Sequence, residues 1–245
     1  MSGVVGMKTL VIMPAYNEEQ NVGATVRGVR RAVPEADVVV INDGSRDNTT
    51  GVALSAGATV LPLPINLGYG GALQVGFIYA EANDYDEVVQ VDADGQHEPE
   101  CVADLLNELR RGDLDLVIGS RFLGTGDYKP SPARALGMAL MRTLTRWTTR
   151  NNITDPTSGF QAMNRKAIAL YASDVYPTDY PDADVLIMIH RAGLRVREIG
   201  VRMYDREAGE SMHSGILKPV WYMFKMLLSI GLTLLRKPPQ VVRSG

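Results

Sequence analysis

Short apolar runs rich in β-branched residues alternate with helical patterns through the first half of the chain. The expected strands are Thr9–Met13, Asp37–Ile41, Thr59–Leu63, Glu87–Val91 and Leu114–Gly119. The expected helices between them are Glu19–Val33, Ser45–Ala56, Tyr69–Ala82 and Pro99–Arg111. Strand–helix alternation implies parallel strands with right-handed crossovers, and near-continuous apolar strands suit a sheet covered on both faces. The pattern predicts an α/β fold with a mostly parallel sheet flanked by helices, and a ligand beyond the carboxyl ends of its strands.

The regular alternation of expected strands and helices ends after residue 120. A proline-broken loop at Lys129–Pro132 precedes a helical pattern at Ala133–Thr149. The remaining expected elements are a strand at Ser158–Asn164, a helix at Asp182–Arg191 and a strand at Arg195–Met203. No repeat or low-complexity tract interrupts them. We therefore expect one domain over residues 7–215, followed by a C-terminal segment over residues 216–237.

Composition excludes several classes of function. The formal net charge of -3 argues against nucleic acid as the main partner, since that would need a basic surface. The single cysteine, Cys101, excludes an internal disulfide framework and a cysteine-only zinc cluster. The first residues lack a basic stretch followed by a long apolar run, so we expect no secretory signal and a cytoplasmic protein.

Polar residues follow three of the expected strands, where they would meet at one edge of the sheet. The stretches are Pro14–Glu19, Asn42–Ser45 and Asp92–Gln96. Asp92 and Asp94, two residues apart after a buried strand, could bind one hard divalent cation, and Gln96 could add an amide oxygen. Such oxygen ligands suit Mg²⁺ or Mn²⁺. An isolated D-x-D is more often a solvated acidic turn, but the two polar strand ends beside it favour a metal site.

Two common phosphate-binding signatures are absent from the sequence. It contains no G-x-x-x-x-G-K-[ST] P-loop, and Pro14–Glu18 occupies the place of a dinucleotide-binding G-x-G-x-x-G. Asn66–Ala72 is glycine-rich and opens a helix, so its backbone could approach a phosphate or a base. A tight strand–helix turn explains that stretch about as well. Because the dinucleotide-binding signature is missing, a nicotinamide-dependent dehydrogenase is disfavoured.

Five motifs, in order, resemble those of family 2 glycosyltransferases with the GT-A fold. They are P-A-Y-N-E-E, N-D-G-S-x-D-x-T, N-x-G-x-G-G-A, D-A-D-G-Q-H and G-S-R. Two later stretches, Asp155–Ala162 and Asp205–Ser211, resemble the polyprenyl-phosphate branch, which includes dolichol-phosphate mannose synthase and bacterial polyprenyl-phosphate hexosyltransferases. The resemblance covers residues 8–212 and implies a GT-A-type nucleotide-binding sheet.

The resemblance also implies roles for individual residues. The base and ribose of the nucleotide would be held by Pro14, Tyr16, Glu18, Ile41 and Asp43. The metal and the diphosphate would be held by Asp92, Ala93, Asp94 and Gln96. The acceptor phosphate would face Arg121 and Arg134, and Arg206 would reach the donor diphosphate. The catalytic contribution would come from Asp94, Arg121, Arg134 and Arg206.

The sequence departs from the family pattern at two positions. Asn42 replaces the first aspartate of the usual D-D-G-S, and Met212 stands where many relatives carry lysine. The second departure removes an expected phosphate-binding cation and leaves the sugar and acceptor preference open. Three further arginines on the helix that carries Arg134 are interpreted as a solvated face: Arg142, Arg146 and Arg150.

The expected activity is metal-dependent, inverting transfer of a hexose from a nucleotide-diphosphate sugar, of the GDP-mannose or UDP-glucose type, to a polyprenyl or dolichyl phosphate. A phosphate monoester is already anionic near neutral pH, so arginines could position it without a strong general base. Transfer to a glycan or small-molecule hydroxyl would need a carboxylate base, for which Asp155 and Asp182 are candidates. A catalytically silent nucleotide-binding protein of the same fold is the third alternative.

The last apolar segment, Ile216–Leu235, predicts an amphipathic helix in the plane of a membrane. Its aromatic residues suit the interface, and its basic residues are expected to reach anionic headgroups: Lys218, Lys225, Arg236 and Lys237. The uncharged run Met226–Leu235 is about half the length of a membrane span. We therefore expect peripheral association with the inner, cytoplasmic face of a membrane. The alternatives are a core helix packed on the sheet and a contact with a second copy of the chain or a membrane protein.

Overall fold

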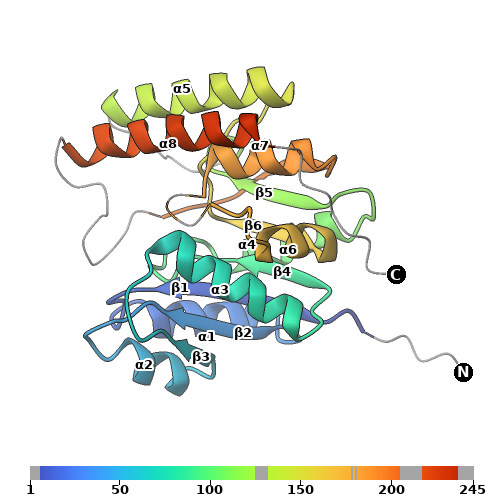
Figure 1. Ribbon diagram of the computed structural model, residues 1–245. Helices are drawn as coiled ribbons and strands as arrows, with labels where there is room; N and C mark the ends of the chain where they lie inside the picture. Colours follow the sequence, from blue (N-terminus) through green and yellow to red (C-terminus); the bar gives the residue numbers. More distant parts are fainter. Residues whose placement is uncertain (1–5, 125–131, 178, 180, 205–216, 237–245) are drawn as a thin grey trace, which may run out of the picture.

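The computed structural model describes residues 6–124, 132–177, 179, 181–204 and 217–236. Its centre is a seven-stranded sheet in the order β3-β2-β1-β4-β6-β5-β7 (Figure 1). The strands are β1 (Thr9–Ala15), β2 (Asp37–Asn42), β3 (Thr59–Pro62), β4 (Glu87–Gln90), β5 (Leu116–Ser120), β6 (Gln161–Asn164) and β7 (Val196–Gly200). β6 pairs antiparallel with β4 and β5, and the other neighbouring strands pair parallel. The expected α/β class and mostly parallel sheet are confirmed.

Helices cover both faces of this sheet. The helices are α1 (Val22–Ala32), α2 (Thr49–Ser55), α3 (Tyr69–Ala82), α4 (Glu100–Leu109), α5 (Pro132–Thr149), α6 (Arg165–Ala172), α7 (Ala183–Arg191) and α8 (Leu217–Leu235). Successive side chains of a strand point to opposite faces, so Val11 and Met13 of β1 pack with α1 and α4. Leu10 and Ile12 pack with α3, α6 and α7 on the other face. The central strands are consequently buried on both sides, as their continuous apolar sequence predicts.

The expected helix at Ser45 begins later, at Thr49. The Ser45 hydroxyl does not cap it, because its oxygen accepts a hydrogen bond from the backbone N–H of Asn17 at 2.9 Å. Asp47 likewise accepts from the backbone N–H of Glu19 at 3.1 Å. The side chains in the loop after β2 therefore bind the backbone of the loop after β1.

Helix α6 is an element that the strand–helix pattern did not predict. It follows β6 directly, and the side chain of Asn164 caps it by accepting hydrogen bonds from the backbone N–H groups of Lys166 and Ala167. Asparagine is a favoured N-cap residue, so Asn164 at the end of the expected strand was the signal for a helix there.

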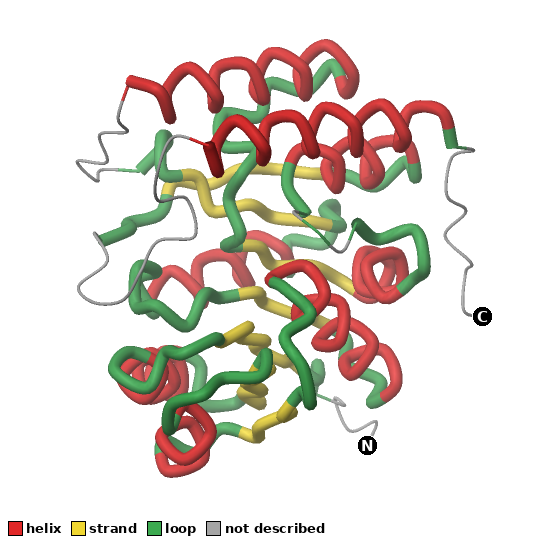
Figure 2. The backbone as a smooth tube through the Cα atoms, turned by 60° about the vertical axis from the view of Figure 1, so that its left-hand side comes forward, coloured by secondary structure: helices red, strands yellow, loops and turns green. Residues whose placement is uncertain are grey.

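Helices α5, α7 and α8 form a further layer beside the sheet (Figures 1 and 2). Met226 and Ile230 of α8 pack with Ala183 and Ile187 of α7 and with Met141 of α5. α8 thus packs on other helices rather than on the sheet itself, and only part of its surface is covered. None of the helices that the structure describes is both long and apolar enough to cross a membrane.

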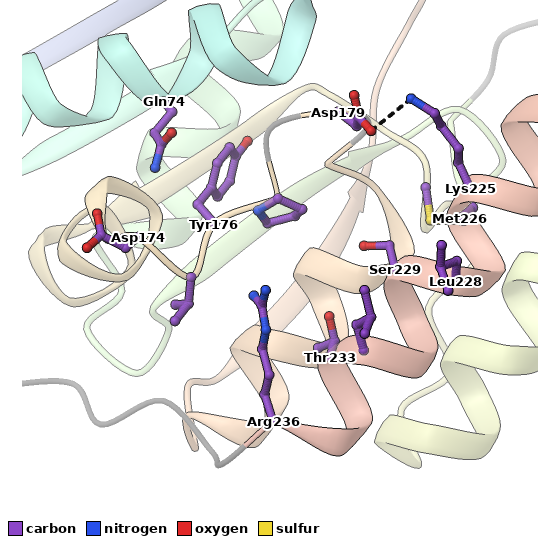
Figure 3. Close-up of a pocket in the computed structure, with 13 residues that line it drawn as sticks. Gln74, Asp174, Tyr176, Asp179, Lys225, Met226, Leu228, Ser229, Thr233 and Arg236 are labelled. Carbon is purple, nitrogen blue, oxygen red and sulfur yellow. Dashed lines mark hydrogen bonds and ion pairs between the residues drawn. The ribbon is translucent and has the colours of Figure 1, made fainter.

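Two polar contacts anchor α8, one to the chain before α7 and one to α7 itself. The ammonium of Lys225 lies 2.9 Å from a carboxylate oxygen of Asp179, and the hydroxyl of Ser229 bonds to the buried carboxylate of Asp184. Beside these contacts runs a cavity of about 570 Å³, into which Arg236 extends (Figure 3). The expectation that Lys225 reaches out to lipid headgroups is corrected here, because its charge is engaged within the protein.

Candidate active site

Asp92 and Asp94 lie directly after β4, at the edge where the parallel strands end. The hydroxyl of Tyr69, on the first turn of α3, donates a 2.8 Å hydrogen bond to Oδ1 of Asp92 and accepts one from Gln90 at 3.0 Å. A Cβ atom at position 159 would lie 2.5 Å from the Tyr69 hydroxyl, so only glycine fits there. Three parts of the chain therefore fix the carboxylate of Asp92.

His97 holds the backbone of the same turn. Its Nδ1 accepts a 3.2 Å hydrogen bond from the backbone N–H of Asp92, and its ring stacks on Phe160 at a centroid distance of 4.4 Å. Burial lowers the pKa of His97 to about 4, so the ring is neutral near pH 7. With Nδ1 as acceptor, Nε2 carries the proton, and it lies 3.7 Å from Oδ2 of Asp92. His97 was missing from the expected site, although it ends the D-A-D-G-Q-H motif.

Gln96 joins the acidic turn to the chain that leaves β7. Its side-chain nitrogen donates to the carbonyl of Tyr204 at 3.2 Å, and its own carbonyl accepts from the N–H of Tyr204 at 2.8 Å. Arg206 and Met212 lie outside the described residues, and the described chain reaches Tyr204 beside the acidic turn.

The oxygen atoms of this turn fit a divalent cation. Asp94 is half-buried and accepts from the backbone N–H of Gln96 at 3.0 Å, and the carboxylate of Asp92, two residues earlier, is partly exposed. Within the described ranges there is no group of three or more histidine, cysteine or carboxylate side chains that could hold a metal ion. Two carboxylates are sufficient when substrate phosphates complete the coordination, as is usual for Mg²⁺.

The expected nucleotide residues fall into two groups. Tyr16 is exposed and Glu18 is buried, but both follow β1 at the sheet edge, where the backbone N–H of Glu18 donates to Thr49 at 2.9 Å. Pro14 and Ile41 are instead buried, as neighbours in the paired strands β1 and β2. The side chain of Ile41 belongs to the apolar core around α3, so the structure places it under the site rather than at its surface.

Asp43 is also buried, and its carboxylate is occupied within the protein. Its two oxygens accept hydrogen bonds from the backbone N–H groups of Leu67 and Gly68, at 2.6 and 2.9 Å. Burial raises the pKa of Asp43, and these two hydrogen bonds oppose the rise. The side chain thereby fixes the glycine-rich turn that opens α3, where Gly68 has a φ of 82° that favours glycine.

The substitution at Asn42 has a local explanation. Its amide oxygen accepts from the backbone N–H of Ser45 at 3.0 Å, and its amide nitrogen donates to the hydroxyl of Thr50 at 2.6 Å. A carboxylate could make both contacts only by accepting the second from the Thr50 hydroxyl, which here is the acceptor. Asn42 therefore connects the end of β2 to the first turn of α2.

Arg121 and Asp155 form an ion pair at the end of β5. The guanidinium bonds both carboxylate oxygens at 2.7 and 2.6 Å, and the backbone N–H of Arg121 adds a third bond at 3.1 Å. The same guanidinium donates to Thr157 at 2.9 Å. Asp155 is completely buried, so its candidacy as a general base is corrected: it holds Arg121. The other candidate, Asp182, precedes α7 as its N-terminal flanking residue.

The arginines of α5 do not share one environment. Arg134 lies in the first turn of α5, and its side chain lies outside the described part. Arg142 is half-buried, donates to the carbonyl of Thr154 at 2.9 Å and lies 5.0 Å from the ring centroid of Phe122. The expectation of a solvated Arg142 is therefore wrong, whereas Arg146 and Arg150 are exposed as expected.

The sheet order, the acidic turn after β4 and the polar ends of β1 and β2 define a glycosyltransferase with the GT-A fold. Residues 10–171 match the model of the family described as glycosyl transferase family 2. The chain belongs to that family. The expected family, fold class and glycosyltransferase identity are thereby confirmed.

Two curated relatives are similar over most of their length. An undecaprenyl-phosphate mannosyltransferase of Micrococcus luteus is 35% identical over 218 residues, which covers 85% of this chain and 88% of the relative. A polyprenol monophosphomannose synthase of Mycolicibacterium smegmatis is 32% identical over 217 residues, with coverage of 85% and 82%.

A solved structure shows the same fold. The glucosyl-3-phosphoglycerate synthase of Mycobacterium tuberculosis, in complex with Mn²⁺, uridine diphosphate and phosphoglyceric acid, superposes with a TM-score of 0.66. It is 21% identical, and the match covers 96% of this chain and 80% of that one. Divalent metal and nucleotide occur together in that relative of the fold.

Proposed function

We propose that this protein transfers a hexose from a nucleotide-diphosphate sugar to a polyprenyl phosphate. The observation that carries the proposal is the place of His97, which accepts from the backbone N–H of Asp92 and stacks on the ring of Phe160. The carbonyl of Phe160 in turn accepts from the N–H of Gly119, two residues before Arg121. One buried ring thus connects the acidic turn to the end of β5, where Arg121 follows. The names of the two curated relatives, which both mention a polyprenyl carrier and mannose, support a lipid phosphate as acceptor.

The proposed chemistry uses the acidic turn for the donor and Arg121 for the acceptor. An oxygen of the acceptor phosphate attacks the anomeric carbon, and the bond from that carbon to the diphosphate breaks with its electron pair on the leaving group, so the configuration inverts. A divalent cation held by Asp92, Asp94 and Gln96 would stabilise the negative charge on the diphosphate. Arg121 would orient the acceptor phosphate, with Arg134 as a second contact and Arg206 at the donor diphosphate. No proton needs to be removed from the nucleophile, because it is already an anion.

The nucleotide side of the site would use Tyr16 and Glu18 at the end of β1. Asp43 and Ile41 support this surface from below, through the α3 turn and the core respectively. Pro14 contributes in the same way, by its place in β1 beside Ile41. Ala93 is buried between the two aspartates and keeps their spacing.

The outer surface of α5 and α8 supports a peripheral position on a membrane. The exposed apolar side chains of the two helices include Leu140, Trp147, Leu227, Leu234 and Leu235. Leu228 and Leu232 are also exposed but line the cavity beside α8. Arg146, on the same helix as Trp147, and Arg150, directly after that helix, are exposed and suit anionic headgroups. Apolar residues with tryptophan and flanking cations are typical of a helix that lies in the interface. In this arrangement the acceptor phosphate would remain at the cytoplasmic surface.

A transfer assay tests the proposal directly. The protein is incubated with Mn²⁺, a polyprenyl phosphate and radiolabelled GDP-mannose or UDP-glucose, and the product is extracted into organic solvent. We expect label in the organic phase with one of these donors and only when the lipid phosphate is present. Label that stays in water on added glycans would support a hydroxyl acceptor instead. A nucleotide-induced thermal shift without transfer to any acceptor would support a catalytically silent nucleotide-binding protein instead.

A further inference from the structure

Glu198, on β7, lies outside every motif that the sequence singles out. Both of its carboxylate oxygens accept hydrogen bonds from successive backbone N–H groups, those of Thr154 at 2.6 Å and Asp155 at 2.7 Å. The side chain is half-buried, and burial raises its pKa while the two backbone bonds oppose that rise. Arg197, the preceding residue, points to the opposite face of the strand and pairs with Glu108 at 2.5 Å. Glu198 is therefore the acidic residue of β7 that faces the loop before β6.

That loop is held from two further directions. The carbonyl of Thr154 accepts from Nε of Arg142 on α5 at 2.9 Å. The hydroxyl of Thr154 lies 2.8 Å from that of Ser120 at the end of β5. Thr154 is thus fixed through its N–H, its carbonyl and its hydroxyl, by three separate elements. The next residue is Asp155, whose carboxylate carries Arg121.

We propose that Glu198 is a positioning residue for the Arg121–Asp155 pair, acting through the two backbone N–H groups of the loop before β6. The positioning of Arg121 by Glu198 is independent of the proposed function. The effect on the acceptor phosphate rests on that function, in which Arg121 faces this phosphate. Loss of Glu198 leaves two N–H groups without their acceptors, and the loop must move or admit water to satisfy them. Asp155 moves with that loop, and the guanidinium of Arg121 follows its bidentate partner.

A carboxylate is the side chain that this geometry needs. Glutamine at position 198 would offer one oxygen to one N–H group and would turn an NH₂ group toward the other. The Glu198→Gln variant therefore keeps size and burial but loses half of the contact. Glu108→Gln is the matched control, because it removes a charged contact to the same strand on its opposite face.

The first measurement is independent of any substrate. In the full-length protein labelled with ¹⁵N, the Nε–H group of Arg121 is bonded to Asp155 and should exchange slowly with solvent. We expect exchange of this group to become about tenfold faster or more in Glu198→Gln, by analogy with other losses of an outer supporting contact. The Glu108→Gln control should leave it unchanged. Unchanged Arg121 exchange in a folded Glu198→Gln protein would overturn the proposal.

The second measurement gives the consequence for transfer. Glu198→Gln should lower kcat/KM for the acceptor by about tenfold while the Kd for nucleotide and Mn²⁺ stays the same. Adding Glu198→Gln to Arg121→Lys should cause little further loss, because the two residues act in series. Equal losses on both substrates, or fully additive losses, would show a general structural role. If the wild-type chain transfers nothing to polyprenyl phosphate, the proposed function fails, while the exchange measurement still decides the role of Glu198.

A second variant covers the case in which Glu198→Gln does not fold. Arg142→Met removes the bond to the carbonyl of Thr154 and keeps an unbranched apolar stem. It should speed the exchange of the Arg121 Nε–H group in the same direction, by a smaller factor because both N–H bonds of the loop remain. Arg121 exchange that stays at the wild-type rate would count against positioning through this loop.

Discussion

The two halves of the sheet build their parts of the site in different ways. In the half that carries β1, β2 and β4, each functional loop directly follows a parallel strand and is held by short bonds between neighbouring loops, such as those made by Asn42 and Asp43. In the half that carries β5, β6 and β7, the functional loop precedes the antiparallel β6. It is held by side chains from β5, β7 and α5.

This difference teaches where the two sides of the site should be sensitive. The loops after β1, β2 and β4 are fixed locally, so changes there should affect donor and metal binding and leave the rest of the fold intact. The loop before β6 depends on an ion pair with a fully buried carboxylate and on contacts from distant elements. Changes there should therefore affect stability and acceptor use together.

The largest effect is expected at the acidic turn. Asp94→Ala removes a proposed metal ligand from a partly exposed position, so transfer should fall by about a thousandfold or more, whereas the melting temperature should change little. The exposed Asp104→Ala on α4 is the matched control and should be neutral. Near-normal turnover of Asp94→Ala at saturating Mn²⁺ would remove Asp94 from the metal site.

The next largest effect is expected on the stability of the half of the sheet that carries β5, β6 and β7. Arg121→Ala leaves the carboxylate of Asp155 buried without its partner, so we expect a loss of about 3–5 kcal/mol in the free energy of unfolding. The exposed pair of Arg165 with Asp86 offers the comparison, and Arg165→Ala should cost at most about 1 kcal/mol. Chemical denaturation measures both.

Arg121→Lys then tests function without removing the charge. Lysine cannot reproduce the bidentate contact, so kcat/KM for the acceptor should fall by about tenfold to a hundredfold with nucleotide affinity preserved. Calorimetric titration with nucleotide supplies the second quantity. A loss confined to nucleotide affinity would place Arg121 on the donor side.

A smaller effect is expected at Tyr69. Tyr69→Phe removes the hydrogen bond to Asp92 but keeps the ring, so the affinity for Mn²⁺ should fall by about tenfold. Tyr79→Phe on the same helix is the control. If both variants bind Mn²⁺ like the wild type, the Asp92 carboxylate needs no support from α3.

The smallest effect concerns the outer helices. Trp147 is 79% exposed, and Trp147→Ala should weaken sedimentation with anionic liposomes by about threefold to tenfold through lost apolar burial. Leu54→Ala on α2, which also removes an exposed apolar side chain, should not change it. Equal liposome binding of all three proteins would indicate that the α5 surface meets another partner.

Sequence reasoning reached further in the first half than in the second. Parallel strands deliver their next residues to one edge, so Asp92 and Asp94 could be placed together from spacing alone. Nothing in the sequence pattern indicates that β6 runs antiparallel. The pairing of Arg121 with Asp155 could therefore not be predicted, because it depends on the loop that leads into this strand. Glu198 and Arg142 were missed for the same reason, since their partners are backbone groups of that loop. Ile41 was misplaced because a strand residue can belong to a motif and still face the core.

The reversal of β6 brings the two ends of the chain between β5 and β6 together at the sheet. This segment leaves the sheet after β5 and returns into β6, and its two ends meet where the N–H of Gly119 bonds the carbonyl of Phe160 at 2.8 Å. A segment whose ends lie together can be replaced by one of different length. The free energy cost of closing a loop grows by only about 0.6 kcal/mol for each doubling of its length. Grafting the corresponding segment of a relative onto this sheet, with Met141 kept to pack against α7, would transplant acceptor recognition and leave the nucleotide side native.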